Sequence, residues 1–452
     1  MKHTRAALTA AVMVLTGHVA GAQEIASRLF LAADRDRDGV LTRAELEATL
    51  GAWEAMTPEQ LPERLERALP LLPQNQTPKP EDVQAMLAAL PGRAPVSPRR
   101  PRRVLVLGKA LGYVHSSIPL AARTIEEMGR QTGAWSTTVT YDPADINQKD
   151  LAQYDALFLA STSGPFLDDP EDAAVTAARR QALLDFVRGG KGLAGIHAAT
   201  VGYYQSLPAP DAPRPASGPA ATLAKALLVQ GDRNGDGRLG REELRTLADA
   251  WYDRLDPERS GRVDQAAFPQ RFAAVLPPPP ASSAPPLGPN GFPIQAPATQ
   301  LGPDTVVSTW PEFTRLLGGL FKFHWNDGQV VTVKVDEPDH PLNVAFKGQP
   351  PLRVMDETYT FARHPYSRRH VRVLTSVDYA AMSAEDKAKE QYPRPDGDYA
   401  LSWIRREGQG RVFYEAHGHS ERVYAIRPML VHLLYGMQYV LGDLKVDDRP
   451  RP

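Results

Sequence analysis

Two twelve-residue stretches carry oxygen-bearing side chains at the spacing of a calcium-binding EF-hand loop. Each has carboxylate or amide residues at positions 1, 3 and 5, a glycine at position 6 and a glutamate at position 12. In such a loop hard oxygen ligands wrap one Ca²⁺, the glycine allows the sharp bend, and the glutamate closes the shell with both oxygens. The predicted ligands are Asp34, Asp36, Asp38, Val40, Thr42 and Glu45 in the first loop and Asp232, Asn234, Asp236, Arg238 and Glu243 in the second.

The two loops belong to an internal duplication. Their sequence similarity continues through the following segment as far as Trp53 in the first repeat and Trp251 in the second. A third loop begins at Asp256 but has Ala267 at its twelfth position, so it lacks the bidentate carboxylate. We therefore expect two Ca²⁺ ions as cofactors and a third, degenerate loop that acts as a structural partner.

The chain begins with the pattern of an export signal. A basic start at Met1 to Arg5 is followed by a short apolar run and by the A-x-A sequence Ala20 to Ala22. This arrangement predicts a signal peptide cleaved near Ala22, and hence a periplasmic or secreted protein. No later segment reaches the length of a membrane span. The net charge of −1 predicts no nucleic-acid partner, and the absence of cysteine excludes disulfides, thiolate metal sites and a cysteine nucleophile.

Alternating strand and helix patterns predict an α/β domain with a doubly wound parallel sheet. Buried-strand signals stand at Val104 to Gly108, Ala156 to Ala160 and Gly192 to Ile196, with helical patterns between them. His115 and His197 each follow such a strand, so both are expected beyond the carboxyl ends of strands at one edge of the sheet, where ligands bind in these folds.

The strand and helix pattern stops near Tyr204 and resumes at Trp310, which predicts that the second EF-hand is an insertion into the α/β domain. The ends of such an insertion should lie close together at the surface. The expected divisions are 1–22 signal peptide, 23–95 N-terminal EF-hand module, 102–206 and 304–446 the two parts of the α/β domain, 220–276 inserted EF-hand module, and 277–303 a proline-rich linker.

Several short motifs, taken in their order along the α/β domain, resemble the ThuA-like (trehalose utilisation) family. They are Tyr113 to Ile118, Gly195 to Thr200, Leu317 to Gly319 with Phe323-His324, Asp339 to Pro341, Asp356 to Tyr359, and Gly410 to Tyr414 leading to Gly418-His419. The resemblance implies the flavodoxin-like sandwich of the class I glutamine amidotransferases and a sugar-related substrate.

Amidotransferases of that fold carry a nucleophilic cysteine on the turn after the central strand. His197 takes this position, and the chain has no cysteine. The resemblance therefore implies the fold and argues against glutamine hydrolysis by a thiolate. An amidotransferase-like reaction would need Ser116 or Thr200 as a replacement nucleophile.

Five polar residues of these motifs are the candidate catalytic groups: His115, His197, His324, Glu357 and His419. Several imidazoles and a carboxylate in one crevice would suit a divalent transition metal such as Zn²⁺, or general acid and base catalysis on a hydroxylated substrate. The alternative is that these histidines hydrogen-bond and position loops. Either catalytic interpretation requires the side chains to lie within about 12 Å of one another, since catalysis works at hydrogen-bond range.

Other ring-bearing residues near the motifs receive different interpretations. His340 and His364 each precede a proline and are expected to be loop residues. Tyr113 and Tyr359 are candidate platforms for a sugar ring, whereas Tyr203, Trp310 and Trp403 are expected in the core.

Two functional hypotheses follow. The first is an exported, calcium-binding ThuA-like protein that binds or acts on a carbohydrate in the histidine-rich crevice. The second is a non-enzymatic, calcium-dependent interaction or scaffold protein.

Overall fold

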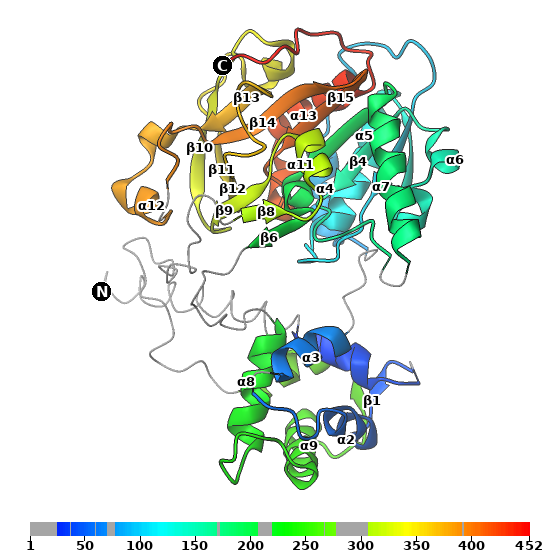
Figure 1. Cartoon of the computed structure of the whole chain (residues 1–452), viewed down its shortest axis with the longest axis vertical. Coiled ribbons are helices and arrows are strands. Elements are labelled where there is room, and N and C mark those ends of the chain that lie inside the picture. The colour runs from blue at the N-terminus through cyan, green and yellow to red at the C-terminus, as the bar shows by residue number, and fades with distance from the viewer. Residues whose placement is uncertain are drawn as a thin grey trace. The chain divides into compact units, whose positions relative to one another are not determined.

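The computed structural model describes residues 25–36, 38–58, 60–69, 77–169, 172–206, 219–265, 267–276, 306–390 and 393–452. The predicted signal peptide and the proline-rich linker lie outside these residues. The chain forms two compact units, one comprising Met1–Leu72 and Ala212–Ala296 and the other comprising Pro73–Asp211 and Pro297–Pro452. Each unit is therefore assembled from two separate stretches of sequence (Figure 1).

The larger unit is built on a nine-stranded sheet whose first half is parallel. The parallel strands stand in the order β3-β2-β4-β5-β15, which is the 2-1-3-4-5 order of flavodoxin-like folds. Their bounds are β2 (Arg103–Leu107), β3 (Ser136–Thr140), β4 (Ala156–Ala160), β5 (Gly192–Ile196) and β15 (Gly410–Glu415). The α/β sandwich predicted from the sequence is confirmed.

The second half of the sheet is antiparallel, which the strand and helix pattern did not predict. It continues from β15 through β14, β13, β10 and β11, because β14 returns directly to β15 through a tight turn at Gly408 with φ of 56°. The bounds are β10 (Val330–Val335), β11 (Arg353–Met355), β13 (Arg372–Val377) and β14 (Ala400–Glu407). A doubly wound parallel sheet is thus correct for only part of the sheet.

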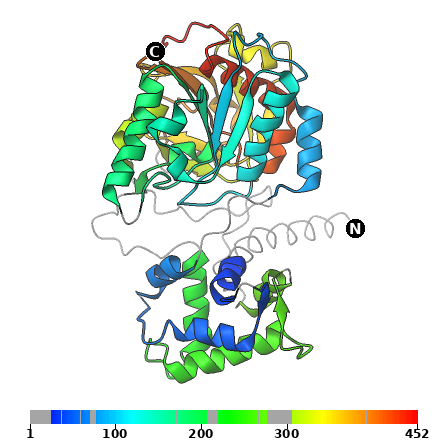
Figure 2. The ribbon, with the colours of Figure 1, turned by 90° about the vertical axis from the view of Figure 1, so that its right-hand side faces the viewer.

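Helices cover both faces of this sheet and bury two hydrophobic clusters (Figure 2). One cluster lies under α7 and α11, and the other lies under α4, α5 and α13. Gly436 of α13 allows close packing, since a Cβ there would stand 2.6 Å from the Phe413 ring. The bounds are α4 (Pro80–Ala89), α5 (Ile118–Thr132), α6 (Gln148–Leu151), α7 (Ala173–Arg188), α11 (Pro311–Leu317), α12 (Ala384–Ala388) and α13 (Arg427–Val440).

Helix α4 corrects one predicted boundary. The sequence assigned residues up to 95 to the N-terminal EF-hand module, but Met86, Ala89 and Leu90 are buried in the cluster under α5 and α13. The apolar face of this helix is covered by the larger unit, so the helix belongs to the α/β domain. The error arose because periodicity identifies an apolar face without saying which surface covers it.

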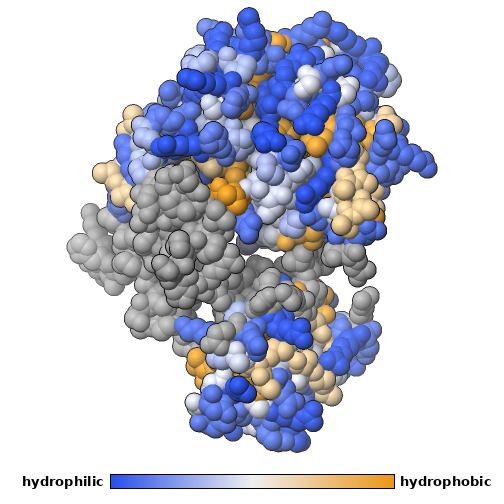
Figure 3. Space-filling model, in the orientation of Figure 1, coloured by the Kyte–Doolittle hydropathy of each residue, from blue (hydrophilic) through white to orange (hydrophobic). Residues whose placement is uncertain are grey.

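Two short strand pairs complete the larger unit. β9 (Phe321–Trp325) pairs with β12 (Thr358–Phe361), and this ribbon carries His324 opposite Tyr359. β6 (Tyr204–Ser206) pairs with β8 (Val306–Ser308), so the chain leaves the unit and re-enters it on adjacent strands. The face of the described residues seen in Figure 3 is mostly hydrophilic, as expected where apolar side chains fill internal clusters.

The smaller unit combines both EF-hand repeats around a single hydrophobic cluster, so the two EF-hand segments of the sequence form one folding unit. Its helices are residues 25–33, α2 (Arg43–Gly51), α3 (Leu61–Ala68), α8 (Pro219–Gly231), α9 (Arg241–Leu255) and α10 (Phe268–Val275).

The two repeats are interleaved. In the first loop β1 (Val40–Leu41) pairs with β7 (Val263–Asp264) of the degenerate third loop, not with the second intact loop. The second intact loop instead accepts a hydrogen bond at the Leu239 carbonyl from Ala55 N, 3.0 Å away in the segment after α2. Each intact loop therefore contacts a segment contributed by the other repeat.

Candidate metal centre and calcium loops

The turn after the central strand β5 places His197 at the sheet edge in a strained backbone conformation. His197 begins the 3-10 helix His197–Val201 with φ of 46°, a left-handed value that costs a non-glycine residue about 1–3 kcal/mol. Its side chain is fully buried, and its Nδ1 lies 2.9 Å from the carbonyl oxygen of Ala416. Because a carbonyl can only accept, Nδ1 carries a proton, and this hydrogen bond orients the imidazole ring.

His115 reaches the same point from the loop between β2 and α5. Its Nε2 lies 3.2 Å from Nε2 of His197, and the two rings meet edge to face. Nδ1 of His115 is buried without a hydrogen-bond partner. At this distance one of the two Nε2 atoms donates a hydrogen bond and the other accepts it.

Glu357, in the turn between β11 and β12, joins three imidazoles. Its Oε2 lies 3.5 Å from His197 Nε2 and 3.2 Å from His419 Nδ1, and its Oε1 lies 3.2 Å from His324 Nδ1. One ligand atom from each of His115, His197, Glu357 and His419 falls within 4.8 Å of all the others. The structure thus brings together four of the five candidate residues, and His324 adjoins them through Glu357.

Burial and neighbouring charges shift the pKa values of the clustered side chains in different directions. Burial, together with the neighbouring His197 and His419, holds the pKa of His115 well below its usual value, and burial also lowers the pKa of His324. Burial would lower the pKa of His419 too, but the carboxylate of Glu357 outweighs it and raises that pKa to about 9. The pKa of Glu357 lies well below its usual value because contacts with His197 and His419 outweigh burial, which acts in the opposite direction. The neutral imidazole is the form that binds metal ions.

The loop that carries His419 is held by Asp356, a buried carboxylate to which we assigned no separate role from the sequence. Its oxygens accept N–H groups from Gly418 at 2.7 Å, Ser420 at 2.9 Å and His419 at 3.3 Å. Asp356 therefore fixes the loop while its neighbour Glu357 faces the imidazoles. The only sequence signal for this role was the pair of adjacent acids in the motif.

Two remaining ring candidates occupy different environments. Tyr113 is 56% exposed, and its ring lies nearly parallel to that of His419, with 6.4 Å between centroids. Tyr359 is buried with its ring 4.1 Å from that of His197, so it supports the histidine and cannot offer a face to a sugar. Interpreting Tyr359 as a platform was therefore wrong, because its ring packs into the hydrophobic cluster under α7 and α11.

The other polar candidates do not join the cluster. Thr200 is buried, with its hydroxyl 3.0 Å from that of Tyr414, which makes it a poor substitute for a nucleophilic cysteine. His340 caps the 3-10 helix Pro341–Phe346 by accepting from Leu342 N. His364 precedes a cis proline in an exposed loop.

The two intact calcium loops have matching internal geometry. In the first, Glu45 accepts N–H groups from Arg35 and Thr42, and Asp34, Asp36 and Asp38 form a carboxylate group within 4.8 Å. In the second, Glu243 accepts from Arg233 and Gly240 at the corresponding positions. Both glutamates therefore already point inward at position 12, where the bidentate ligand is required.

In the third loop, the carboxylate at position 1 accepts hydrogen bonds from groups of the same loop. Asp256 accepts from Ser260 N, Ser260 Oγ and Gly261 N at 2.6 to 2.9 Å. Position 12 is Ala267, which offers no side-chain oxygen. The β1–β7 pairing gives this loop a structural role.

The trehalose utilisation (ThuA) family matches residues 103–214 and 302–440, more than half of the chain. The chain belongs to the ThuA family. An EF-hand family matches residues 25–50 and 224–248, so this ThuA-family protein also has a calcium-binding unit.

Solved structures that resemble this ThuA-family protein do so at low sequence identity. A ThuA-like protein from Bacteroides uniformis is 16% identical over 76% of this chain and 92% of that one, with a TM-score of 0.40. One from Parabacteroides merdae is 12% identical over 77% and 92%, with a TM-score of 0.36. A beta-galactosidase from Bacillus circulans is 8% identical over 77% and 32%, with a TM-score of 0.30. No curated protein matches the chain, and no helix among the described residues is long and apolar enough to cross a membrane.

Calcium titration of the chelator-treated protein by calorimetry should reveal two sites with dissociation constants on the order of 10⁻⁴ to 10⁻³ M, as in extracellular modules. Glu45→Gln and Glu243→Gln should each remove one site, and the double substitution should remove both, because each loses the bidentate ligand. Glu258→Gln, an exposed change in the third loop, should leave both sites intact. Unchanged heat in the double variant would contradict the assignment.

Asp356→Asn should lower the free energy of unfolding of the larger unit by about 1–3 kcal/mol, because a charged acceptor of three N–H groups is replaced by an amide. Denaturant unfolding followed by tryptophan fluorescence measures the change. Asp339→Asn is the matched control, since that carboxylate is 93% exposed and should alter stability by less than about 0.5 kcal/mol. Equal effects of the two substitutions would show that Asp356 does not hold the loop.

Proposed function

We propose that this ThuA-family protein is an exported enzyme whose histidine crevice binds one divalent transition-metal ion and acts on a carbohydrate, with the EF-hand unit stabilised by calcium. The observation that carries the proposal is the convergence of His115, His197, Glu357 and His419 within 4.8 Å. Three imidazoles and one carboxylate are a typical donor set for Zn²⁺ and related ions.

The separations between donor atoms support a tetrahedral ion. Metal–ligand bonds of about 2.0–2.1 Å place neighbouring donors of a tetrahedron about 3.3 Å apart. The His115–His197, His197–Glu357 and His419–Glu357 pairs stand at 3.2, 3.5 and 3.2 Å. The His197 Nδ1 hydrogen bond to Ala416 is the kind of outer contact that orients a metal-binding imidazole.

Because four protein ligands would fill a tetrahedral shell, a bound ion would supply Lewis-acid polarisation only to a substrate oxygen that adds as a fifth ligand. The protein's own groups would hold and move the proton. His324 Nδ1 contacts Glu357 Oε1 at 3.2 Å, and its side chain is 31% exposed, so it can exchange a proton with a substrate hydroxyl. Its pKa, lowered by burial, keeps it largely neutral near pH 7, which suits a general base.

The choice of a carbohydrate rests on the family's description and on Tyr113. The family is described by trehalose utilisation. An exposed aromatic face beside the cluster is the kind of surface on which a pyranose ring packs. Export is supported by the leader pattern in residues 1–22.

Measuring how much zinc the protein retains should distinguish the proposed metal site from a scaffold role without one. Metal-stripped full-length protein, with Ca²⁺ at saturation, should retain about one Zn²⁺ per chain after equilibration and desalting, as counted by mass spectrometry. His197→Ala should lose this ion. His370→Ala, which changes an exposed histidine outside the cluster, should keep it.

The second part of this experiment measures whether the zinc-loaded protein binds a sugar. Trehalose titrated into the zinc-loaded protein should give heat that disappears in His197→Ala. Zinc retained equally by all three proteins, or no zinc in any, would overturn the metal proposal. Retained zinc with no response to trehalose or other glycosides would overturn the carbohydrate proposal.

A further inference from the structure

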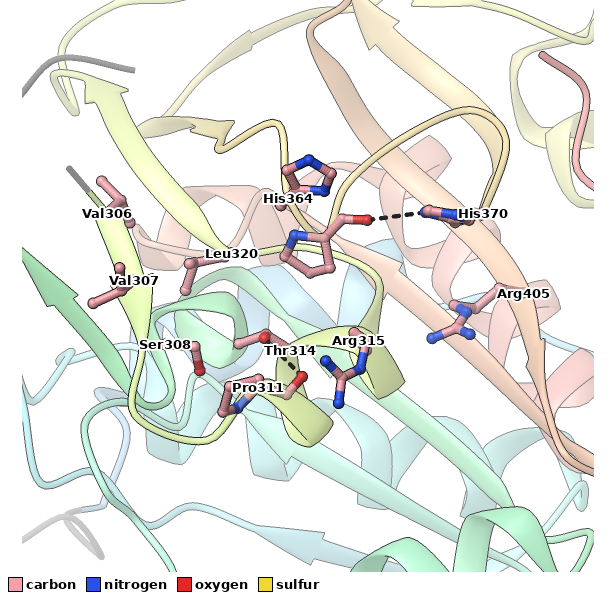
Figure 4. A pocket seen from close by; sticks show the side chains of 11 residues that line it. Val306, Val307, Ser308, Pro311, Thr314, Arg315, Leu320, His364, His370 and Arg405 are labelled. Atoms are coloured by element: carbon pink, nitrogen blue, oxygen red, sulfur yellow. Dashed lines mark hydrogen bonds between the residues drawn. The ribbon is translucent and has the colours of Figure 1, made fainter. Parts of the chain in front are cut away.

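A cavity of about 660 Å³ opens on the larger unit (Figure 4). It is bounded by β8, α11, the loop containing His364 and His370, and Arg405 of β14. None of the five candidate catalytic residues lines it. Its volume falls within the range of about 300–1,000 Å³ for small-molecule sites.

The lining combines an apolar wall with basic side chains, and none of the described residues that line it is a carboxylate. Val306, Val307 and Leu320 contribute to the apolar part. Arg315 and Arg405 contribute guanidinium groups from α11 and β14, and Figure 4 shows both beside the same opening. The side chains of His364 and His370 add polar nitrogens from the loop that carries them. A ligand here would meet positive charge at one end and hydrocarbon at the other.

Arg405 is held in place before any ligand arrives. It donates through Nη1 to the Leu316 carbonyl at 2.8 Å and through Nη2 to Glu407 Oε2 at 2.9 Å. Its Nε is buried and has no hydrogen-bond partner. Burial lowers the pKa of Arg405 despite the neighbouring Glu407, so its charge is only partly compensated. An anion nearby would offset this desolvated charge.

Arg315 supplies a second cation that is free to move toward a ligand. Its side chain is 62% exposed, and its ion partner among the described residues is the exposed Glu312, 3.3 Å away on the same helix. Such a surface pair is worth less than about 1 kcal/mol, so exchanging it for a bound anion costs little.

We propose that this cavity binds a small organic anion, with its carboxylate or phosphate group between Arg315 and Arg405 and its apolar body against Val306, Val307 and Leu320. The site is independent of the crevice. Because β8 is the strand on which the chain returns from the EF-hand insertion, the anion would also contact the point of re-entry.

Calorimetric titration of the full chain with benzoate, phenyl phosphate and benzyl alcohol tests this site. The three probes share an aromatic body and differ in the charged group. At least one anion should bind to a single site roughly tenfold or more tightly than the neutral alcohol, as expected for charge-assisted hydrogen bonds. The tighter of the two anions identifies the carboxylate or the phosphate as the preferred group.

Substitutions test whether the anionic probe binds in this cavity. Arg315→Gln and Arg405→Gln should each weaken binding of the anionic probe. Arg369→Gln also removes one positive charge, but at an exposed position outside the lining, so it should leave the affinity unchanged. His197→Ala should bind the probe normally, because the cavity does not include the crevice. If Arg405→Gln does not fold, Arg315→Gln decides the question. Binding of benzyl alcohol as tight as that of the anions, unchanged affinity in Arg315→Gln, or loss in His197→Ala would overturn the proposal.

Discussion

The hydrogen bond from His197 Nδ1 to the carbonyl oxygen of Ala416 is the contact on which the histidine cluster depends. It joins the turn after β5 to the segment after β15, and these strands are parallel neighbours in the sheet. The bond orients the imidazole so that Nε2 faces His115 and Glu357. The left-handed backbone of His197 costs about 1–3 kcal/mol, which the surrounding sheet and this bond offset.

The calcium unit obeys a different constraint, since neither repeat builds a core alone. The single cluster draws buried residues from both repeats, and each intact loop contacts a segment of the other repeat. Calcium bound at either loop therefore stabilises one shared fold. At a calcium concentration ten times the dissociation constant, each site would contribute about 1.4 kcal/mol to the stability of that fold.

Local patterns were enough to predict the calcium loops and the parallel half of the sheet. An EF-hand loop takes all its ligands from twelve consecutive residues, and the position of His115 and His197 follows from the rule that parallel strands end at one edge. The contacts that the sequence did not reveal are long-range. Asp356 acts through backbone N–H groups more than sixty residues away, which leave no side-chain pattern. Periodicity identifies an apolar face but does not tell which surface covers it. It therefore could not predict that α4 packs on the larger unit, that Tyr359 is buried, or that the two repeats share one core.

The most direct test of the metal centre is X-ray absorption at the zinc edge of protein loaded with one Zn²⁺ per chain and saturated with Ca²⁺. A site made by His115, His197, His419 and Glu357 predicts four nitrogen or oxygen neighbours at about 2.0–2.1 Å, with outer-shell scattering from three imidazoles that is lost in His197→Ala. A shell of six oxygen atoms without imidazole scattering, or a spectrum unchanged by that substitution, would contradict it.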